Sequence, residues 1–240
     1  MRLGIMQPYF FPYLGYFSLM HAVDRWVVFD TPQYIRRGWV NRNRVLTLGN
    51  DDWKYIQLPT RKAPRETPIN EIEISTAADW RTDIVRNLDY YEHHKAPYYE
   101  SVRAFVVSTF EFESGLLSEQ LIHMLKCTCD LLQIEFAQFE VFSRMDLTIG
   151  PVTHAGEWAL RISETLNADT YVNPPGGRDI FEARDFQDLG IALRFLEGNM
   201  QPYNQGPSSF VSGLSVLDCL MWLGPQETRN HIEQFELGDA

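Results

Sequence analysis

Short apolar runs and amphipathic stretches alternate over the first 30 residues. Residues 3–6 and 26–29 are brief apolar runs of the kind that form buried strands. Between them, apolar side chains recur at helical spacing from about Pro12 onward. A strand, a loop, a helix and a second strand in this order predict the start of a parallel sheet with a right-handed crossover.

The rest of the chain continues this alternation with one interruption. Residues 44–48 and 53–58 flank the sequence Gly-Asn-Asp-Asp at 49–52, which is typical of a hairpin turn, and residues 69–74 alternate like a further strand. Helices are predicted at 79–88, 99–110, 118–132, 153–166 and 214–223, and strands at 139–142, 170–172 and, as the last one, 192–196.

These elements predict a single α/β domain over residues 1–240. We expect a mainly parallel Rossmann-like sheet flanked by helices, because strands and helices alternate in both halves of the chain. A small β-hairpin insertion is expected at about 44–75, followed by a helical segment at about 77–133.

Composition and charge narrow the class of protein. The chain is 45% hydrophobic and 22% charged, as ordinary globular proteins are, and its net charge of −11 argues against general affinity for nucleic acid or anionic membranes. It contains no apolar stretch of about 18 residues, so no membrane span is expected. Three cysteines without metal-ligand spacing predict free thiols in a reducing cytoplasm and no metal site. The oligomeric state is left open.

The loop after the first predicted strand holds candidate ligand contacts. In nucleotidyl transferases, a His-x-Gly-His tetrad at a helix start holds phosphate, and here the tetrad Tyr13-Leu14-Gly15-Tyr16 occupies the comparable place. The chain resembles that superfamily only at this level. Tyrosine donates hydrogen bonds but carries no positive charge at neutral pH. Gln7, Tyr13 and Tyr16 are therefore predicted to be uncharged site residues, with packing in the core as the alternative.

An arginine-rich segment follows the second predicted strand. Four arginines fall within nine residues, between Arg36 and Arg44, in an otherwise acidic chain. Arginine binds phosphate or carboxylate well, and the segment leaves the carboxyl end of a strand, where open α/β sheets bind ligands. The segment thus predicts an anion site, and the alternative is a solvated loop that forms salt bridges.

Four further places carry polar side chains that can act on a ligand. His94 and Lys95 are a possible base and anion contact, or a surface turn. The Pro/Gly loop at 173–178 follows a predicted strand and resembles a second ligand loop, although it lacks the spacing of a phosphate-binding P-loop. Gln205 lies between a strand and a helix and is able to bind a polar group. His154 and Glu157, three apart on one helix face, form a possible base and its orienting partner.

Taken together, these segments resemble the WbqC-like family nearly end to end. The stretches that carry the resemblance are "GIMQPYFFPYLGYF", "VVFDTPQYIRRGWVNRNR", "KAPYY", "ADTYVNPPGGRDIF" and "QPYNQ...F...LSVLDCLM". Such proteins are found among genes for bacterial surface polysaccharides such as O-antigen, which implies a role in building or decorating a sugar. Position by position, the family pattern points to Gln7, Asp30, Gln33, Arg37, Asn41, Arg42, Lys95, Gly177 and Gln205.

This reading predicts a cytoplasmic transferase that moves an acyl or aminoacyl group to a nucleotide-linked amino sugar. The expected donor is an activated acyl group or a nucleotide. A base must leave the attacking amine neutral, and Asp30 or His94 is predicted to serve. The other roles assigned are the floor of the site (Tyr13, Gly15, Tyr16), the phosphate or carboxylate contacts (Arg37, Arg42) and the opposite wall (Gly177, Arg178). The alternatives are a non-catalytic sugar-nucleotide binder or assembly protein of the same pathway and, third, a nucleotidyl transferase.

Overall fold

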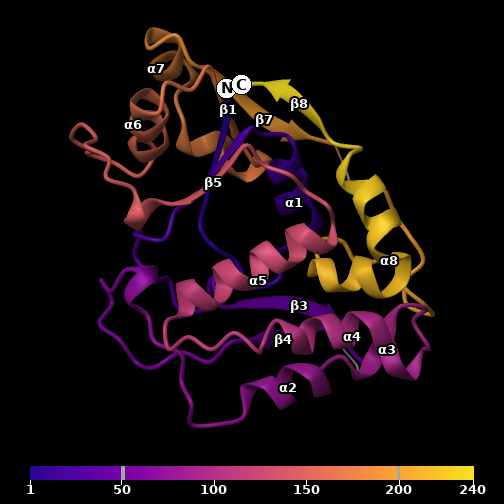
Figure 1. Ribbon diagram of the computed structural model, residues 1–240. Helices are drawn as coiled ribbons and strands as arrows, with labels where there is room; N and C mark the ends of the chain where they lie inside the picture. Colours follow the sequence, from indigo (N-terminus) through magenta and orange to yellow (C-terminus); the bar gives the residue numbers. More distant parts are fainter. Residues whose placement is uncertain (50–51, 199–200) are drawn as a thin grey trace.

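A six-stranded sheet with helices on both faces forms the body of the protein (Figure 1). The computed structural model describes residues 1–49, 52–198 and 201–240. The strands lie in the order β5-β2-β1-β6-β7-β8, and all neighbours are parallel except β7 and β8. Their bounds are β1 (Arg2–Met6), β2 (Arg25–Val28), β5 (Gln138–Val141), β6 (Thr170–Asn173), β7 (Ala192–Glu197) and β8 (Glu236–Asp239). The expected α/β class and mainly parallel Rossmann-like sheet are confirmed.

Both faces of the sheet are apolar. Successive side chains of a strand point to opposite sides, and in these strands apolar side chains occur on both. Leu3 and Ile5 pack on one face in a cluster with side chains of α6 and α7, whereas Trp26 and Val28 join the larger core formed with α1, α5 and α8. Burial on two faces explains why these strands appear in the sequence as unbroken apolar runs. The helices are α1 (Leu14–His21), α2 (Trp80–Arg86), α3 (Asp89–His93), α4 (Tyr99–Ser108), α5 (Leu117–Leu131), α6 (Glu157–Thr165), α7 (Ala183–Asp188) and α8 (Val216–Ile232).

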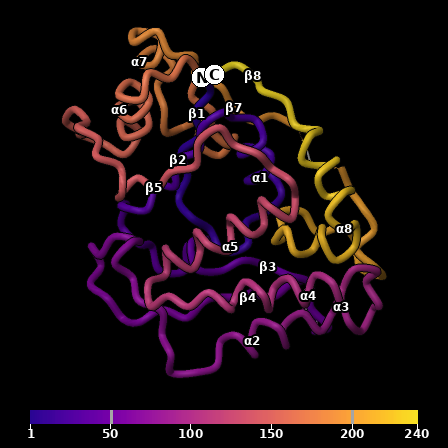
Figure 2. Tube along the Cα trace, viewed as in Figure 1, coloured from indigo at the N-terminus to yellow at the C-terminus, as the bar shows by residue number. Residues whose placement is uncertain are grey.

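A long insertion separates β2 from its sheet partner β5. It contains the antiparallel hairpin of β3 (Arg42–Leu46) and β4 (Trp53–Gln57), followed by α2 to α5. The predicted hairpin is confirmed, and the turn residues Asn50 and Asp51 lie outside the described residues. Figure 2 shows the insertion as a layer below the sheet, with α5 above the hairpin and leading back to β5.

Two predicted elements differ in the structure. The strand expected at 69–74 is wrong: η1 (Ile69–Glu71) is a short 3-10 helix, because the amides of Ile69 and Asn70 bond to the Pro32 and Asp30 carbonyls rather than to a strand. The strand at 192–196 is not the last one, since β8 pairs antiparallel with the end of β7. The β8 sequence Glu-Leu-Gly-Asp has no apolar alternation, which is why the pattern missed this edge strand.

The ends of several helices also differ from prediction. α6 begins at Glu157, four residues later than expected, and α8 continues to Ile232 across a break at Gly224. The short helices α3 and α7 were not predicted, because five or six residues show too little periodicity. Across the described ranges, no helix combines the length and apolar character needed to cross a membrane.

A candidate ligand cavity at the carboxyl edge of the sheet

The order of the strands reverses beside β1. The chain runs from β1 through α1 to β2 on one side, and it later returns to place β6 on the other side of β1. Loops that leave the two strands diverge at such a point, and open α/β sheets bind ligands in the crevice that results. A cavity of about 690 Å³ lies there, lined by residues that follow β1, β2 and β6 and by the start of α6.

The lining of this cavity is aromatic and neutral. Its rings and amides include Gln7, Tyr9, Tyr13, Phe29, Gln33, Trp39, Trp158, Asn173 and Phe181. Among the described residues that line it, none is an aspartate, glutamate, histidine, lysine or arginine. Trp39 is 44% exposed and therefore forms part of the rim. Flat apolar rings with a few amides suit a ligand that has both apolar faces and hydroxyl or carbonyl groups.

Of the opening tetrad, Tyr13 is the member that faces the cavity. Gly15 lies behind it: a Cβ at Gly15 would stand 2.7 Å from the Tyr13 ring, so glycine is what lets this ring lie over the helix start. Tyr16 is buried, and its hydroxyl donates to the Gln7 carbonyl at 2.8 Å. Burial raises the pKa of Tyr13 to about 12, helped by the nearby Tyr9, so this phenol stays neutral. Gly15 and Tyr16 thus support two lining residues, Tyr13 and Gln7.

The loop that carries Tyr13 is fixed from two sides. The Asn43 side chain in β3 donates to the carbonyls of Phe10 and Phe11 at 3.3 and 2.8 Å. Ser215, which caps α8, donates its hydroxyl to the Phe11 carbonyl at 2.8 Å. Because both side chains are buried, the loop is held in one conformation before any ligand arrives.

Gly177 and Asn173 lie in contact in the cavity wall that follows β6. The Asn173 amide donates to the Tyr171 hydroxyl, and an ideal Cβ at Gly177 would lie 2.1 Å from its Oδ1 atom. A side chain at 177 would therefore displace this amide from the wall. Arg178, predicted to close the same wall, is engaged elsewhere: it bonds Glu197 at 2.8 Å and the Asp239 carbonyl at 3.1 Å, at the β7–β8 edge.

Asp30, one of the two predicted bases, is enclosed in the fold. It is 2% exposed, and its carboxylate accepts hydrogen bonds from the Ser143 amide at 3.0 Å and the Ser143 hydroxyl at 2.6 Å. These bonds tie the end of β2 to the turn after β5. The carboxylate is not part of the cavity lining.

Within the arginine-rich segment, most polar groups hold the loop together. Arg42 donates to the Gly38 and Arg37 carbonyls and stacks on the Tyr55 ring, with its guanidinium carbon 4.0 Å from the ring centre. Asn41 is buried and donates to the Leu58 carbonyl at 2.7 Å.

Arg37 and Gln33 lie differently in that segment. Arg37 is exposed and has a φ of +62°, a left-handed conformation that is uncommon outside glycine and often marks functional loops. In the part of the chain that the structure describes, no protein group bonds its guanidinium. Gln33 lines the cavity, and its amide donates to the Arg65 carbonyl at 2.7 Å.

The remaining predicted residues gather at a second place, beside α3 and α8. The His94 ring lies 4.5 Å from the ring of Tyr90, and Lys95 is exposed with a φ of +52°. Figure 2 shows α3 in the insertion layer, away from β2 and β5. His94 and Lys95 are therefore not brought together with Gln7 and Asp30.

A buried carboxylate organises this second place. Asp218 accepts hydrogen bonds from the Tyr91 hydroxyl at 2.8 Å, from the Gln205 amide at 2.8 Å and from the Tyr203 hydroxyl. Burial raises its pKa to about 6, and the three donors oppose that rise. Gln205 is 1% exposed and also bonds the backbone of Val211, so its side chain is used inside the fold.

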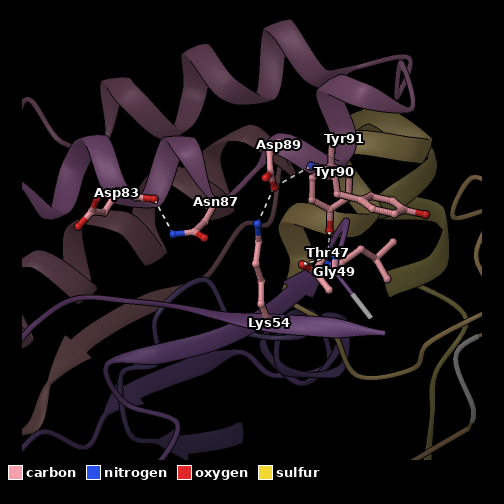
Figure 3. Close-up of polar contacts among 9 residues, drawn as sticks. Thr47, Gly49, Lys54, Asp83, Asn87, Asp89, Tyr90 and Tyr91 are labelled. Carbon is pink, nitrogen blue, oxygen red and sulfur yellow. Dashed lines mark hydrogen bonds and ion pairs between the residues drawn. The ribbon is translucent and has the colours of Figure 1, made fainter. Parts of the chain in front are cut away.

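The hairpin positions α3 next to this carboxylate. Lys54 in β4 pairs with Asp89 at the start of α3 at 2.5 Å, and Asp89 also accepts from the Tyr90 amide at 3.0 Å (Figure 3). The neighbouring Tyr91 hydroxyl receives the Leu46 amide of β3 at 3.3 Å and donates to Asp218. The cluster thus joins the insertion to α8.

Three aromatic lining residues were not among the predicted site residues. Tyr9, Trp39 and Trp158 all line the cavity, and the signal that could have found Tyr9 and Trp39 is their place inside the loops after β1 and β2. Trp158 lies within the predicted helix 153–166, where an apolar side chain is typical of the core. His154 directly precedes a lining residue, Ala155, and its Nε2 atom is 3.8 Å from the Glu157 carboxylate, which also accepts from the Thr153 amide.

The fold and the cavity define an α/β protein with a Rossmann-like sheet and a ligand-sized crevice at its switch point. The chain belongs to the WbqC-like protein family, whose model matches residues 7–230. It is similar to an uncharacterized protein of Mycobacterium tuberculosis, with 26% identity over 231 residues, which cover 94% of this chain and 95% of that protein. No solved structure matches the chain.

Proposed function

We propose that the protein is a transferase that binds a nucleotide-linked amino sugar in this cavity and modifies it during bacterial surface-polysaccharide biosynthesis. The observation that carries the proposal is the neutral aromatic lining at the switch point of the sheet. Aromatic rings cover the C–H faces of a sugar ring, and the amides of Gln7, Gln33 and Asn173 suit its hydroxyls. Membership of the WbqC-like family supports the same reading.

The favoured reaction is N-acyl or aminoacyl transfer to the sugar amine. The amine nitrogen attacks the carbonyl of an activated donor, a C–N bond forms, and the bond from that carbonyl to the leaving group breaks. Only the neutral amine attacks, and burial away from carboxylates lowers the pKa of an ammonium group, so this cavity favours the reactive form. Since neither Asp30 nor His94 lines the cavity, the departing group of the donor is the proposed acceptor of the amine proton.

One observation favours the second candidate, a non-catalytic binder of the same ligand. The described lining residues carry no carboxylate or imidazole for proton transfer. Incubation with UDP-glucosamine and acyl or aminoacyl thioesters separates the two candidates. A mass increase of the sugar nucleotide supports the transferase, whereas binding without product from any donor supports the binder. Release of pyrophosphate from a nucleoside triphosphate would instead support nucleotidyl transfer.

Replacement of Arg37 by alanine tests the phosphate or carboxylate contact predicted for the arginine-rich segment. Since this guanidinium is exposed and unbonded by described residues, we expect UDP-glucosamine to bind about two- to five-fold more weakly. The melting temperature should stay unchanged. Calorimetric titration measures the affinity, and Arg184→Ala on α7, whose side chain is 87% exposed, is the matched control. Equal affinities in both variants would remove Arg37 from the site.

A further inference from the structure

A nucleotide-linked sugar carries two negative charges on its diphosphate, and the cavity offers no cation to meet them. Among the described lining residues there is no lysine, arginine or histidine. A diphosphate buried in such a neutral cavity would be strongly disfavoured, because a desolvated charge needs a partner. If the sugar occupies the cavity, the diphosphate therefore lies outside it, next to available cations.

A second hollow, with two arginines, begins where the cavity ends. This groove of about 580 Å³ is lined by residues 33–36 on one side and residues 63–65 on the other. Gln33 belongs to both linings, so cavity and groove meet at this side chain. Arg36 stands on one wall of the groove and Arg65 on the other.

The two walls of the groove are already joined. Arg36 donates to the Ala63 carbonyl at 2.8 Å, and the Gln33 amide donates to the Arg65 carbonyl at 2.7 Å. The Tyr34 amide adds a bond to the Thr67 carbonyl at 2.9 Å. Both arginines are nonetheless exposed, so their remaining donors face solvent. A groove fixed in this way loses little further freedom when a ligand binds.

The charge of this region is opposite to that of the whole chain. Residues 33–65 contain eight lysines and arginines and two aspartates, whereas the net charge of the protein is −11. Two other arginines near the cavity are engaged: Arg44 donates to the Gly213 carbonyl at 2.9 Å, and Arg178 pairs with Glu197 at 2.8 Å. Arg37 is exposed like Arg36, but it lines neither the cavity nor the groove. The groove is thus the place where an anion leaving the cavity meets guanidinium groups with free donors.

We propose that the groove between residues 33–36 and 63–65 binds the diphosphate of a nucleoside diphosphate, with Arg36 and Arg65 as its cationic contacts. The sugar would extend from this diphosphate past Gln33 into the neutral cavity. This inference rests on the proposed function for the identity of the sugar, but the groove itself requires only a nucleoside diphosphate.

Titration of wild type, Arg36→Gln, Arg65→Gln and the double variant with UDP tests the groove. We expect each single variant to bind UDP about five- to ten-fold more weakly, and the double variant more weakly than either, because a charge-assisted bond is lost each time. Arg65→Gln is the cleaner variant, since its side chain holds no described wall contact. Arg184→Gln on α7 is the matched control and should bind like wild type. Raising the salt concentration should weaken wild-type binding more than binding by the double variant.

The outcomes separate this inference from the proposed function. UDP affinity that is unchanged in Arg65→Gln and in the double variant, or no UDP binding at all, overturns the groove. Titration with UDP-glucosamine then measures how much affinity the sugar adds. If binding of UDP depends on the arginines but the glucosamine adds no affinity, the groove is supported and the proposed sugar site is wrong. If UDP-glucosamine binds with the same affinity when both arginines are replaced, the sugar site is retained and the groove is wrong.

Discussion

Gly177→Ala is expected to weaken binding of UDP-glucosamine by about ten-fold or more. The added Cβ would lie 2.1 Å from Asn173 Oδ1 and 3.2 Å from the Phe181 ring, so the Asn173 amide must leave its position. That movement removes a polar contact from the cavity wall and breaks the bond to the Tyr171 hydroxyl. We expect a fall of about 1–2 kcal/mol in the free energy of unfolding, with the fold retained. Calorimetric titration and urea unfolding measure the two effects.

The adjacent glycine provides the control. Gly176 also lines the cavity, but a Cβ added there meets no described atom within 4 Å. Gly176→Ala should therefore keep the affinity within about two-fold and leave the stability unchanged. If both alanine variants bind equally well, Asn173 is not a ligand contact and the β6 wall of the proposed site is wrong.

Asp218→Asn should remove a large pH dependence of stability. Burial raises the pKa of Asp218 to about 6 in the folded protein, above the value of an unfolded aspartate, so the folded state holds the proton more tightly. The stabilisation by this group is complete below about pH 4 and is lost as the pH rises to about 6. The wild type should therefore lose about 3 kcal/mol relative to the asparagine variant between pH 4 and pH 7.

Urea unfolding of both proteins at several pH values measures this difference. The groups around the carboxylate do not obscure it, because burial raises the pKa values of Tyr91, Tyr203 and Cys219 and keeps them neutral over this range. Exposed carboxylates titrate alike in both proteins and cancel in the comparison. Parallel stability curves would mean that the pKa of Asp218 in the folded protein is not raised above that of an unfolded aspartate.

The fold was predictable because its core follows the strand and helix periods. Leu3 and Ile5 alternate with residues of the opposite face, and the apolar positions of α5 recur at helical spacing. β8 was missed because an edge strand of four residues with a single apolar side chain, Leu237, is defined by its partner β7 and not by its own pattern. Likewise, the 3-10 helix at Ile69 depends on carbonyls about 40 residues earlier in the chain.

The candidate site was partly predictable for a similar reason. Gln7, Tyr13, Gln33 and Gly177 were singled out from the loops after strands, and the structure places them in one cavity, although their roles remain predictions. Polar residues of suitable type elsewhere have partners that the sequence does not reveal. The carboxylate of Asp30, for example, accepts two hydrogen bonds from Ser143, which lies more than a hundred residues later in the chain.

Other charged and amide side chains also have partners within the fold. Gln205 bonds to Asp218 inside the fold, and Arg42 stacks on Tyr55 of the opposite strand. Residue type and local spacing identify groups that are able to bind a ligand. Tertiary contacts decide which of them stay free to do so. The aromatic residues Tyr9 and Trp39 line the cavity, whereas none of its described lining residues is charged.

A crystal structure of the protein with UDP-glucosamine tests the central claim most directly. We predict the glucosamine ring in the cavity after β1, β2 and β6, in contact with Tyr13 and Asn173, and the diphosphate beyond Gln33. Density for the sugar at any other place, with this cavity empty at a saturating ligand concentration, would contradict the account.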